Sequence, residues 1–132
     1  MLEPRKMLRA YLLADSAVEK AVGTRVYYPT VPAGAQKPLV VIYPNISRVP
    51  SRDLNGVAYR RVRIQVTAMA DTQPEAEAAA HAVINAVEGF NGKMYGVLPV
   101  ILATVDNDRQ VYQDDVGEIH HHVDVMISYK EE

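Results

Sequence analysis

The longest regular pattern in the chain is an alternation of apolar and polar residues that begins at Tyr59. The apolar positions are Val62, Ile64, Val66 and Ala68, and the polar positions between them are Arg61, Arg63, Gln65 and Thr67. A period of two is typical of a strand with one buried face, because successive side chains of a strand point to opposite sides. The segment therefore predicts a long, half-buried strand.

An alanine-rich segment follows this strand and predicts a helix that continues to Val87. Asp71 or Thr72 can accept hydrogen bonds from the first free backbone N–H groups of the helix. Pro74 suits the first turn, and the acidic side chain of Glu75 complements the positive end of the helix dipole. The strand and helix together indicate an α+β domain, and neither carries an obvious catalytic group.

The remaining elements are predicted from shorter patterns. We expect a helix at 4–14 and a second short helical turn that Asp15 or Ser16 caps and that runs through Val22. Strands are expected at 25–28, 39–43, 96–105, 109–113 and 118–129, and turns at 91–93, 106–108 and 114–117. Prolines, asparagines and glycine in the segment 44–56 predict an extended arm or loop between two antiparallel strands. The fold class is thus α+β: one domain over 1–132, with a mainly antiparallel sheet packed by an N-terminal helix and a longer central helix.

Composition narrows the class of protein. A chain of 132 residues that is 48% hydrophobic can bury a core of its own. It has no cysteine, which excludes disulfides, thiolate metal sites and cysteine nucleophiles. No apolar run approaches the roughly 20 residues that span a bilayer, and the N-terminus lacks a signal-peptide pattern. We therefore expect a cytosolic product that does not contact membranes.

The net charge is −2, and the charged residues are unevenly distributed along the chain. Residues 26–70 contain six basic residues and one acid, whereas residues 106–132 contain eight acids and two bases. Two interpretations remain open. The opposite charges can pair across strands within one monomer, or they can form complementary faces that meet between subunits in a head-to-tail ring.

Three consecutive histidines are the most conspicuous candidate site. Only His120 and His122 can share a face of a strand, with Asp124 beside them, while His121 must point to the other side. Two histidines without a nearby cysteine fall short of a zinc site. We interpret the row as solvated or interface-lining, and an interface there would make assembly depend on pH, since histidine titrates near neutrality.

The arginines of the central segment are the other candidate group: Arg48, Arg52, Arg60, Arg61 and Arg63. Subunit salt bridges or a solvated face are the first interpretation, and contact with nucleic acid phosphate is the second. The sequence has no glycine-rich phosphate loop, and its serines lack the context of a nucleophile elbow. We therefore expect no catalytic residue, no cofactor and no metal site.

The order of these elements resembles the tail terminator, or tail completion, proteins of long-tailed phages and prophages. The resemblance covers nearly the whole chain and is carried by Asp15-Ser16-Ala17-Val18, Val22-Gly23-Thr24-Arg25-Val26-Tyr27, Pro38-Leu39-Val40-Val41-Ile42-Tyr43, Arg63-Ile64-Gln65-Val66, Ala70-Asp71-Thr72 and Val125-Met126-Ile127-Ser128-Tyr129. Each motif alone is weakly specific, and their order and spacing carry the signal.

The resemblance implies a virion structural protein of the neck region, assembled in the host bacterial cytoplasm. Such proteins form a ring, usually a hexamer, at the head-proximal end of the tail tube. The ring ends tube growth and joins the head. The implied partners are further copies of the chain, the tail tube protein, a head completion or connector protein, and genomic DNA that passes through the lumen without sequence-specific binding.

The resemblance adds expectations for single residues. Arg48, Arg52, Arg61, Arg63, His120, His122 and Asp124 become candidates for an interface that faces a neighbouring subunit or DNA, with Arg61 and Arg63 paired to acids such as Asp124 of another subunit. Three alternatives remain open: another neck or head–tail connector protein, a small metal- or ligand-binding α+β module that uses the histidine row, and a hydrolase of unrecognised type.

Overall fold

A computed structural model of the chain describes residues 3–52, 58–94, 98–113 and 117–130, with the backbone alone over 44–52 and at 58. Its elements, in chain order, are α1 (Pro4–Ala14), α2 (Ser16–Val22), β1 (Val26–Tyr27), β2 (Leu39–Arg52), β3 (Ala58–Ala70), α3 (Gln73–Val87), β4 (Gly92–Met94), β5 (Leu98–Gln113) and β6 (Glu118–Lys130). The α+β class predicted from the sequence is confirmed.

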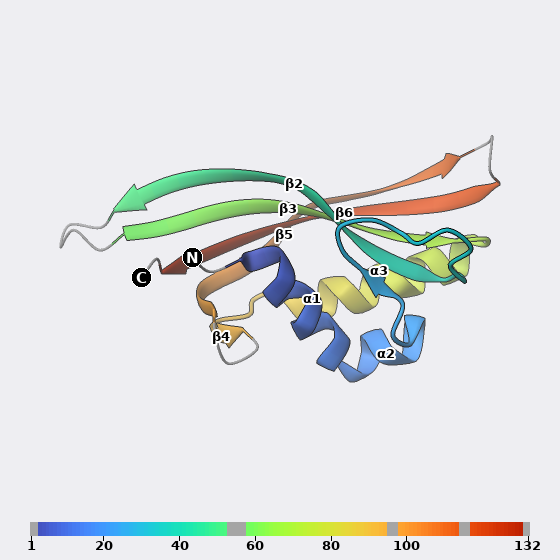
Figure 1. The fold of residues 1–132 in the computed structure, drawn as a ribbon, viewed down its shortest axis with the longest axis horizontal. Helices are drawn as coiled ribbons and strands as arrows, with labels where there is room; N and C mark the ends of the chain where they lie inside the picture. The colour runs from blue at the N-terminus through green and yellow to red at the C-terminus, as the bar shows by residue number, and fades with distance from the viewer. Residues whose placement is uncertain (1–2, 53–57, 95–97, 114–116, 131–132) are drawn as a thin grey trace.

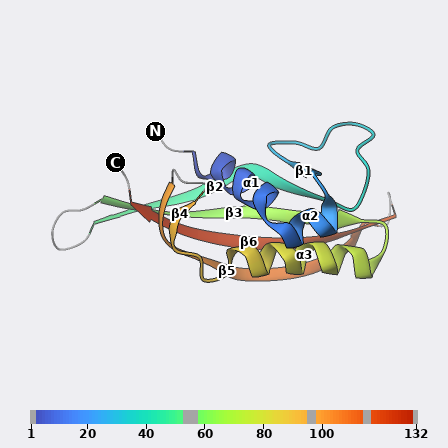
Figure 2. The same cartoon turned by 90° about the horizontal axis from the view of Figure 1, so that it is seen from below.

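The described strands form one curled sheet in the order β1-β2-β3-β6-β5-β4. The short β1–β2 pair is parallel, and all other neighbouring strands are antiparallel. The three helices lie on one face of the sheet, with α3 along β5 and β6 and with α1 and α2 beside it (Figures 1 and 2). At one end of the elongated molecule β2 and β3 extend beyond the helices, and at the other end β5 and β6 rise away from α3 (Figure 1).

The core lies between the helices and the inner face of the sheet. The alternation predicted for β3 is confirmed, because Val62, Ile64 and Val66 are fully buried. In the register of β3 and β6, these residues lie opposite Ile127, Val125 and Val123. From the other side, α1 and α2 supply Leu8, Leu12, Val18 and Val22, all fully buried. The apolar stripe of the helices, at helical spacing, thus packs against the apolar inner face of the sheet, which has a period of two.

The helix ends differ in how they are capped. The carboxylate of Asp15 accepts hydrogen bonds from the backbone N–H groups of Ala17 and Val18 at 3.0 and 3.1 Å. Thr72 occupies the N-cap position of α3, but its side chain makes no cap hydrogen bond. Its hydroxyl instead donates to Glu75 Oε1 at 2.8 Å. The expectation that a side chain of Asp71 or Thr72 caps α3 is therefore wrong.

This contrast predicts unequal costs for two cap substitutions. Asp15→Ala should lower the free energy of unfolding by about 1 kcal/mol, because it leaves two N–H groups of α2 without a protein acceptor. Thr72→Ala removes no cap bond and should cost distinctly less. Urea unfolding of both variants at neutral pH measures the difference, and equal losses would contradict the assignment of the caps.

Of the extended arm or loop predicted at about 44–56, the loop is wrong over 44–52, where the chain continues β2 as an extended strand paired with β3. The rest of that segment, 53–56, lies outside the described residues. β1 is only two residues long, so most of the outer edge of β2 has no neighbouring strand among the described elements. Pro44 falls where the register shifts between Ile42 and Ile46. Edge strands and bulges are the positions where a sheet tolerates proline.

The hairpin turn predicted at 106–108 is also wrong. β5 runs without interruption from Leu98 to Gln113, and the register with β6 merely shifts between Val105 and Asn107. The regular alternation of β6 supplies partners for β5 from Val100 to Gln113, so the extra polar residue is accommodated as a bulge. The two separate strands predicted here are therefore parts of one strand.

The turn predicted at 91–93 is displaced towards the N-terminus. Gly92–Met94 form β4, and the turn that follows α3 lies before them, at Glu88 and Gly89. Gly89 has a φ angle of 80°, a conformation that glycine adopts without strain. The turn ends before residue 90, and Gly92–Met94 pair with β5.

Candidate functional site

The face of the sheet that is turned away from the helices carries the candidate residues of β3 and β6. We call it the open face. The residues that the register places on it include Arg61, Arg63, Gln65 and Thr67 from β3; Leu102, Thr104, Asn107, Arg109 and Val111 from β5; and Glu118, His120, His122, Asp124, Met126, Ser128 and Lys130 from β6. No helix of the described chain covers this face (Figures 1 and 2). It is polar along most of its length.

The two histidines expected to share a face do so. His120 and His122 lie on the open face with their rings 6.1 Å apart and nearly perpendicular. His122 Nδ1 lies 2.8 Å from Thr67 Oγ1 and 3.0 Å from Gln65 Nε2. Because the amide of Gln65 can only donate from its nitrogen, Nδ1 of His122 acts as an acceptor, which requires the neutral ring.

An ion-pair chain extends the histidine row to the end of the sheet. His120 Nε2 donates to Glu118 Oε1 at 3.0 Å. The ammonium of Lys37, from the loop between β1 and β2, pairs with Glu118 and lies 3.4 Å from Asp71 Oδ1. The hydrogen bond from Lys37, and then that from His120, lowers the pKa of Glu118 from its usual value. These contacts tie a proline-rich loop to the last strand.

Acidification should destabilise the folded protein through His122 and Glu118. Burial lowers the pKa of His122 from its usual 6.5, and the nearby positive charge of Arg109 and the His120 ring lower it further against the opposing effect of Asp124. A histidine whose folded pKa is depressed contributes stability that is present above the unfolded pKa and is lost as the pH falls through the folded pKa. The depressed pKa of Glu118 acts in the same direction at lower pH.

We therefore expect the free energy of unfolding to fall as the pH drops from 7.5 to 5. His122→Asn should flatten this dependence, whereas the same change at His81, an exposed residue of α3, should leave it intact. Urea titrations at several pH values measure both slopes. A dependence that survives His122→Asn unchanged would contradict the role given to His122.

Arg63 and Asp124 are brought together within one chain. Arg63 Nη1 lies 2.6 Å from Asp106 Oδ2 and 4.0 Å from Asp124 Oδ2, and Arg109 Nη1 lies 3.8 Å from the same Asp124 oxygen. For Arg63, the interpretation of cross-strand pairing inside a monomer is therefore the one the structure supports. A contact of Arg63 with an acid of another subunit is not needed to neutralise its charge.

Arg61 lies in a different environment. It is exposed and lines a shallow depression of about 460 Å³ together with Tyr59, Ile101, Ser128 and Lys130. No acidic residue is among those that line it. Arg48 and Arg52 lie on β2 opposite Val62 and Ala58, and their side chains fall outside the described part of the chain.

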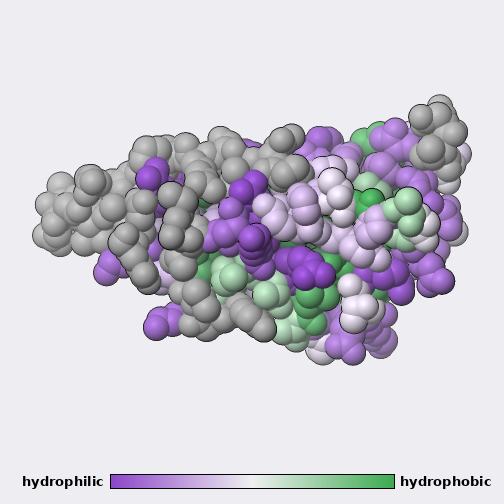
Figure 3. All heavy atoms as spheres, in the orientation of Figure 1, coloured by the Kyte–Doolittle hydropathy of each residue, from purple (hydrophilic) through white to green (hydrophobic). Residues whose placement is uncertain are grey.

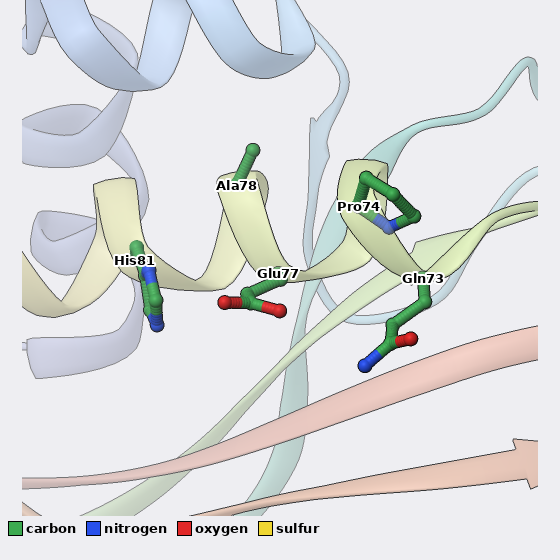
Figure 4. Close-up of a pocket in the computed structure, with 5 residues that line it drawn as sticks. All are labelled: Gln73, Pro74, Glu77, Ala78 and His81. Atoms are coloured by element: carbon green, nitrogen blue, oxygen red, sulfur yellow. The ribbon is translucent and has the colours of Figure 1, made fainter.

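A second depression of about 420 Å³ lies along α3, lined by Gln73, Pro74, Glu77, Ala78 and His81. Figure 4 shows Gln73, Glu77 and His81 directed to the same side of the helix. The ring of His81 lies 6.4 Å from that of His121, which points to the inner face of β6. His121 is nearly buried and its Nε2 donates to Asp108 Oδ2 at 2.8 Å.

Sequence reasoning missed the His121–Asp108 pair, because it placed a turn at Asp108. The pair is a histidine oriented by a carboxylate, and the residues that line the adjacent depression include no serine or threonine nucleophile. Within the described residues, no group of three or more histidine, cysteine or acidic side chains is arranged to hold a metal ion. Nor is any helix in those ranges long and apolar enough to cross a membrane.

The model of a family described as "Tail completion protein gp17" matches residues 6–130. No curated protein sequence matches the chain. Among solved structures, a chain of the "Virion of native gene transfer agent (GTA) particle" superposes with a TM-score of 0.81 at 18% identity, over 96% of this chain and 94% of that chain. At that identity the likeness shows a shared fold.

Proposed function

This chain belongs to the tail completion protein gp17 family and is a phage tail structural protein, and we propose that it forms a hexameric ring at the head-proximal end of the tail tube. The ring ends tail elongation and presents the surface to which the head joins. The observation that carries the proposal is the family match, which spans all of the described elements except the first two residues of α1.

The fold supports a role in a particle. A chain of the gene transfer agent virion shares it over nearly its whole length. Residues 26–70 have an excess of basic residues and residues 106–132 an excess of acids, a distribution that suits contacts between unlike surfaces of neighbouring copies. We propose that the protein resides in the virion neck, is assembled in the host bacterial cytoplasm and works without catalysis or a cofactor.

The proposed partners follow from this position. One side of the ring contacts the tail tube protein, the other contacts a head completion or connector protein, and the genome passes through the lumen without sequence-specific binding. The interface residues that we assign to subunit or DNA contacts are Arg48, Arg52, Arg61, Arg63, His120, His122 and Asp124. For Arg61, exposure and the lack of an ion pair within the described residues support a contact outside the chain.

The proposal is tested by the native mass of the purified protein, measured by light scattering, with negative-stain images of the same sample. We expect a hexamer-sized particle with a central hole. If the protein is a monomer, the same measurement is repeated on tail tubes incubated with it, where a ring should form on one tube end. A protein that forms no ring in either sample contradicts the proposal, and binding to filled heads in place of tails would favour another neck component.

A further inference from the structure

One end of the open face holds two cations that take no part in the ion pairs of that face. The shallow depression there has a volume of about 460 Å³ and is lined by Tyr59, Arg61, Ile101, Ser128 and Lys130. In the register of β3 and β6, Arg61 lies opposite Ser128 and Tyr59 lies opposite Lys130. We call this group of five residues the Arg61 depression.

The charges of the Arg61 depression are not neutralised within the described chain. Arg61 and Lys130 are exposed, and neither makes an ion pair with another described residue. Further along β3, by contrast, the charge of Arg63 is met by Asp106 at 2.6 Å. Two neighbouring cations without a carboxylate attract an anionic group, and a guanidinium can bind a carboxylate through two parallel hydrogen bonds.

Exposed aliphatic side chains adjoin these cations. Ile101 and Leu102 are exposed by 47% and 45%. The register between β5 and β6 shifts at this point, so that Leu102 lies opposite Ser128 while Ile101 lines the depression. Few large hydrophobic side chains of the described residues are exposed to this extent, and hydrophilic residues predominate among the coloured atoms of Figure 3. An exposed apolar pair beside free cations is typical of a contact with another molecule.

This combination suits a protein better than a nucleic acid. Interfaces with nucleic acid are polar and strongly positive, and a phosphate backbone offers no apolar group to match Ile101 and Leu102. Arginine and tyrosine are enriched at interfaces between proteins, where an apolar centre has a polar rim. The segment that fits therefore carries a carboxylate for Arg61 and Lys130 and an apolar side chain for the aliphatic pair.

A second copy of this chain offers few free carboxylates to such a site. Most of the described acids have a partner in their own chain: Glu3, Asp15, Asp71, Glu75, Glu88, Asp106, Asp108, Glu118 and Asp124. The described acids outside this set, Glu19 and Glu77, lie on α2 and α3, on the covered side of the sheet (Figure 2). A different protein is therefore the better source of the carboxylate.

We propose that the Arg61 depression binds the tail tube protein, through a segment in which an acidic residue adjoins an apolar one. The inference rests on the proposed ring and refines it: Arg61 leaves the residues assigned to subunit or DNA contacts and, with Lys130, faces the tube. Because the chain belongs to a family of tail proteins, the tail supplies the neighbouring protein. Contact with the apolar pair excludes water from the ion pairs beside it, where charges then attract more strongly.

The test uses Lys130, the lysine that lines the depression. Tail tubes from cells that lack the chain are capped with the purified protein and treated with a carbodiimide, which joins a lysine amine to a carboxylate in direct contact. Mass spectrometry of the digested sample identifies the protein whose carboxylate is joined to Lys130. Lys130→Arg is the matched control, because it keeps the charge and removes the amine. Arg61→Lys added to that control returns an amine to the depression.

We expect Lys130 to be joined to an acidic residue of the tube protein, no such product with Lys130→Arg, and its return when Arg61→Lys is added. Products that join Lys130 only to acids of this chain would overturn the proposal. Capped tubes that give no product at all would overturn it too, while the ring itself would stand. If the wild-type chain neither forms a ring nor caps tubes, the proposed ring fails, and this docking site fails with it.

Charge reversal gives a second readout. Arg61→Glu with Lys130→Glu should raise the protein concentration needed to cap the tubes by at least about tenfold, because like charges would then meet in the contact. Lys6→Glu with Lys20→Glu makes the same change of charge at exposed positions of α1 and α2, and should cap as the wild type does. Equal losses in the two pairs would contradict the proposal. So would normal capping by the first pair with lost binding to filled heads or to a short DNA duplex.

Discussion

Ile64→Ala should lower the free energy of unfolding by about 2–5 kcal/mol, the largest loss expected from a single substitution in this chain. Ile64 is fully buried in β3, opposite Val125 of β6 and Ile46 of β2. It therefore lies near the middle of the sheet, where neighbouring strands on both sides limit the collapse of a cavity. The loss combines the transfer free energy of the removed methylene groups with the cost of the cavity.

The matched control for this change is Met126→Ala. Met126 is a side chain of similar size that lies half-buried on the open face of the neighbouring strand, so its removal leaves no enclosed cavity. Urea unfolding at low protein concentration, where assembly does not add to the apparent stability, compares the two variants. If both lose the same free energy, the helices and the inner face of the sheet are not the core of the protein.

The second large effect is expected from an increase in size. Ala80→Leu should cost about 1–3 kcal/mol, because α3 packs through small side chains. Ala76, Ala79 and Ala80 are all at most 1% exposed. A leucine at this position has no space without moving the helix away from its neighbours, and a well-packed interior resists that displacement.

Ala78→Leu is the control on the same helix. Ala78 is exposed, and leucine is nearly as good a helix former as alanine, so the change should stay within about 0.5 kcal/mol. Thermal unfolding followed by circular dichroism separates the two variants. A tolerated leucine at position 80, or an equal loss at both positions, would show that α3 does not lie against the sheet through its alanines.

The strand β3 and the helix α3 could be predicted from the sequence because each follows a single periodic pattern of residues. In β3, the burial of one face produces a period of two over the whole strand. In α1 and α2, apolar residues recur at helical spacing, and residues that favour helix capping precede them. The side of the sheet on which His120, His122 and Asp124 lie followed from the same alternation. These elements depend on local sequence and on one buried face.

The length of β5 could not be predicted in the same way. Asp106, Asn107 and Asp108 have the composition of a turn, but tertiary contacts outweigh this preference, because Asp106 pairs with Arg63 and Asp108 accepts from His121. Both contacts depend on the register of β5 against β6, which includes a bulge that no local pattern marks.

The position of this protein on finished tails is the most direct test of the proposed ring. Tails are purified from cells that produce the particle with and without the chain, and averaged electron images compare the two tube ends. We expect a ring of density at the head-proximal end that vanishes without the chain, together with tubes of uncontrolled length. Tails of normal length with an unchanged end in the absence of the chain would contradict it.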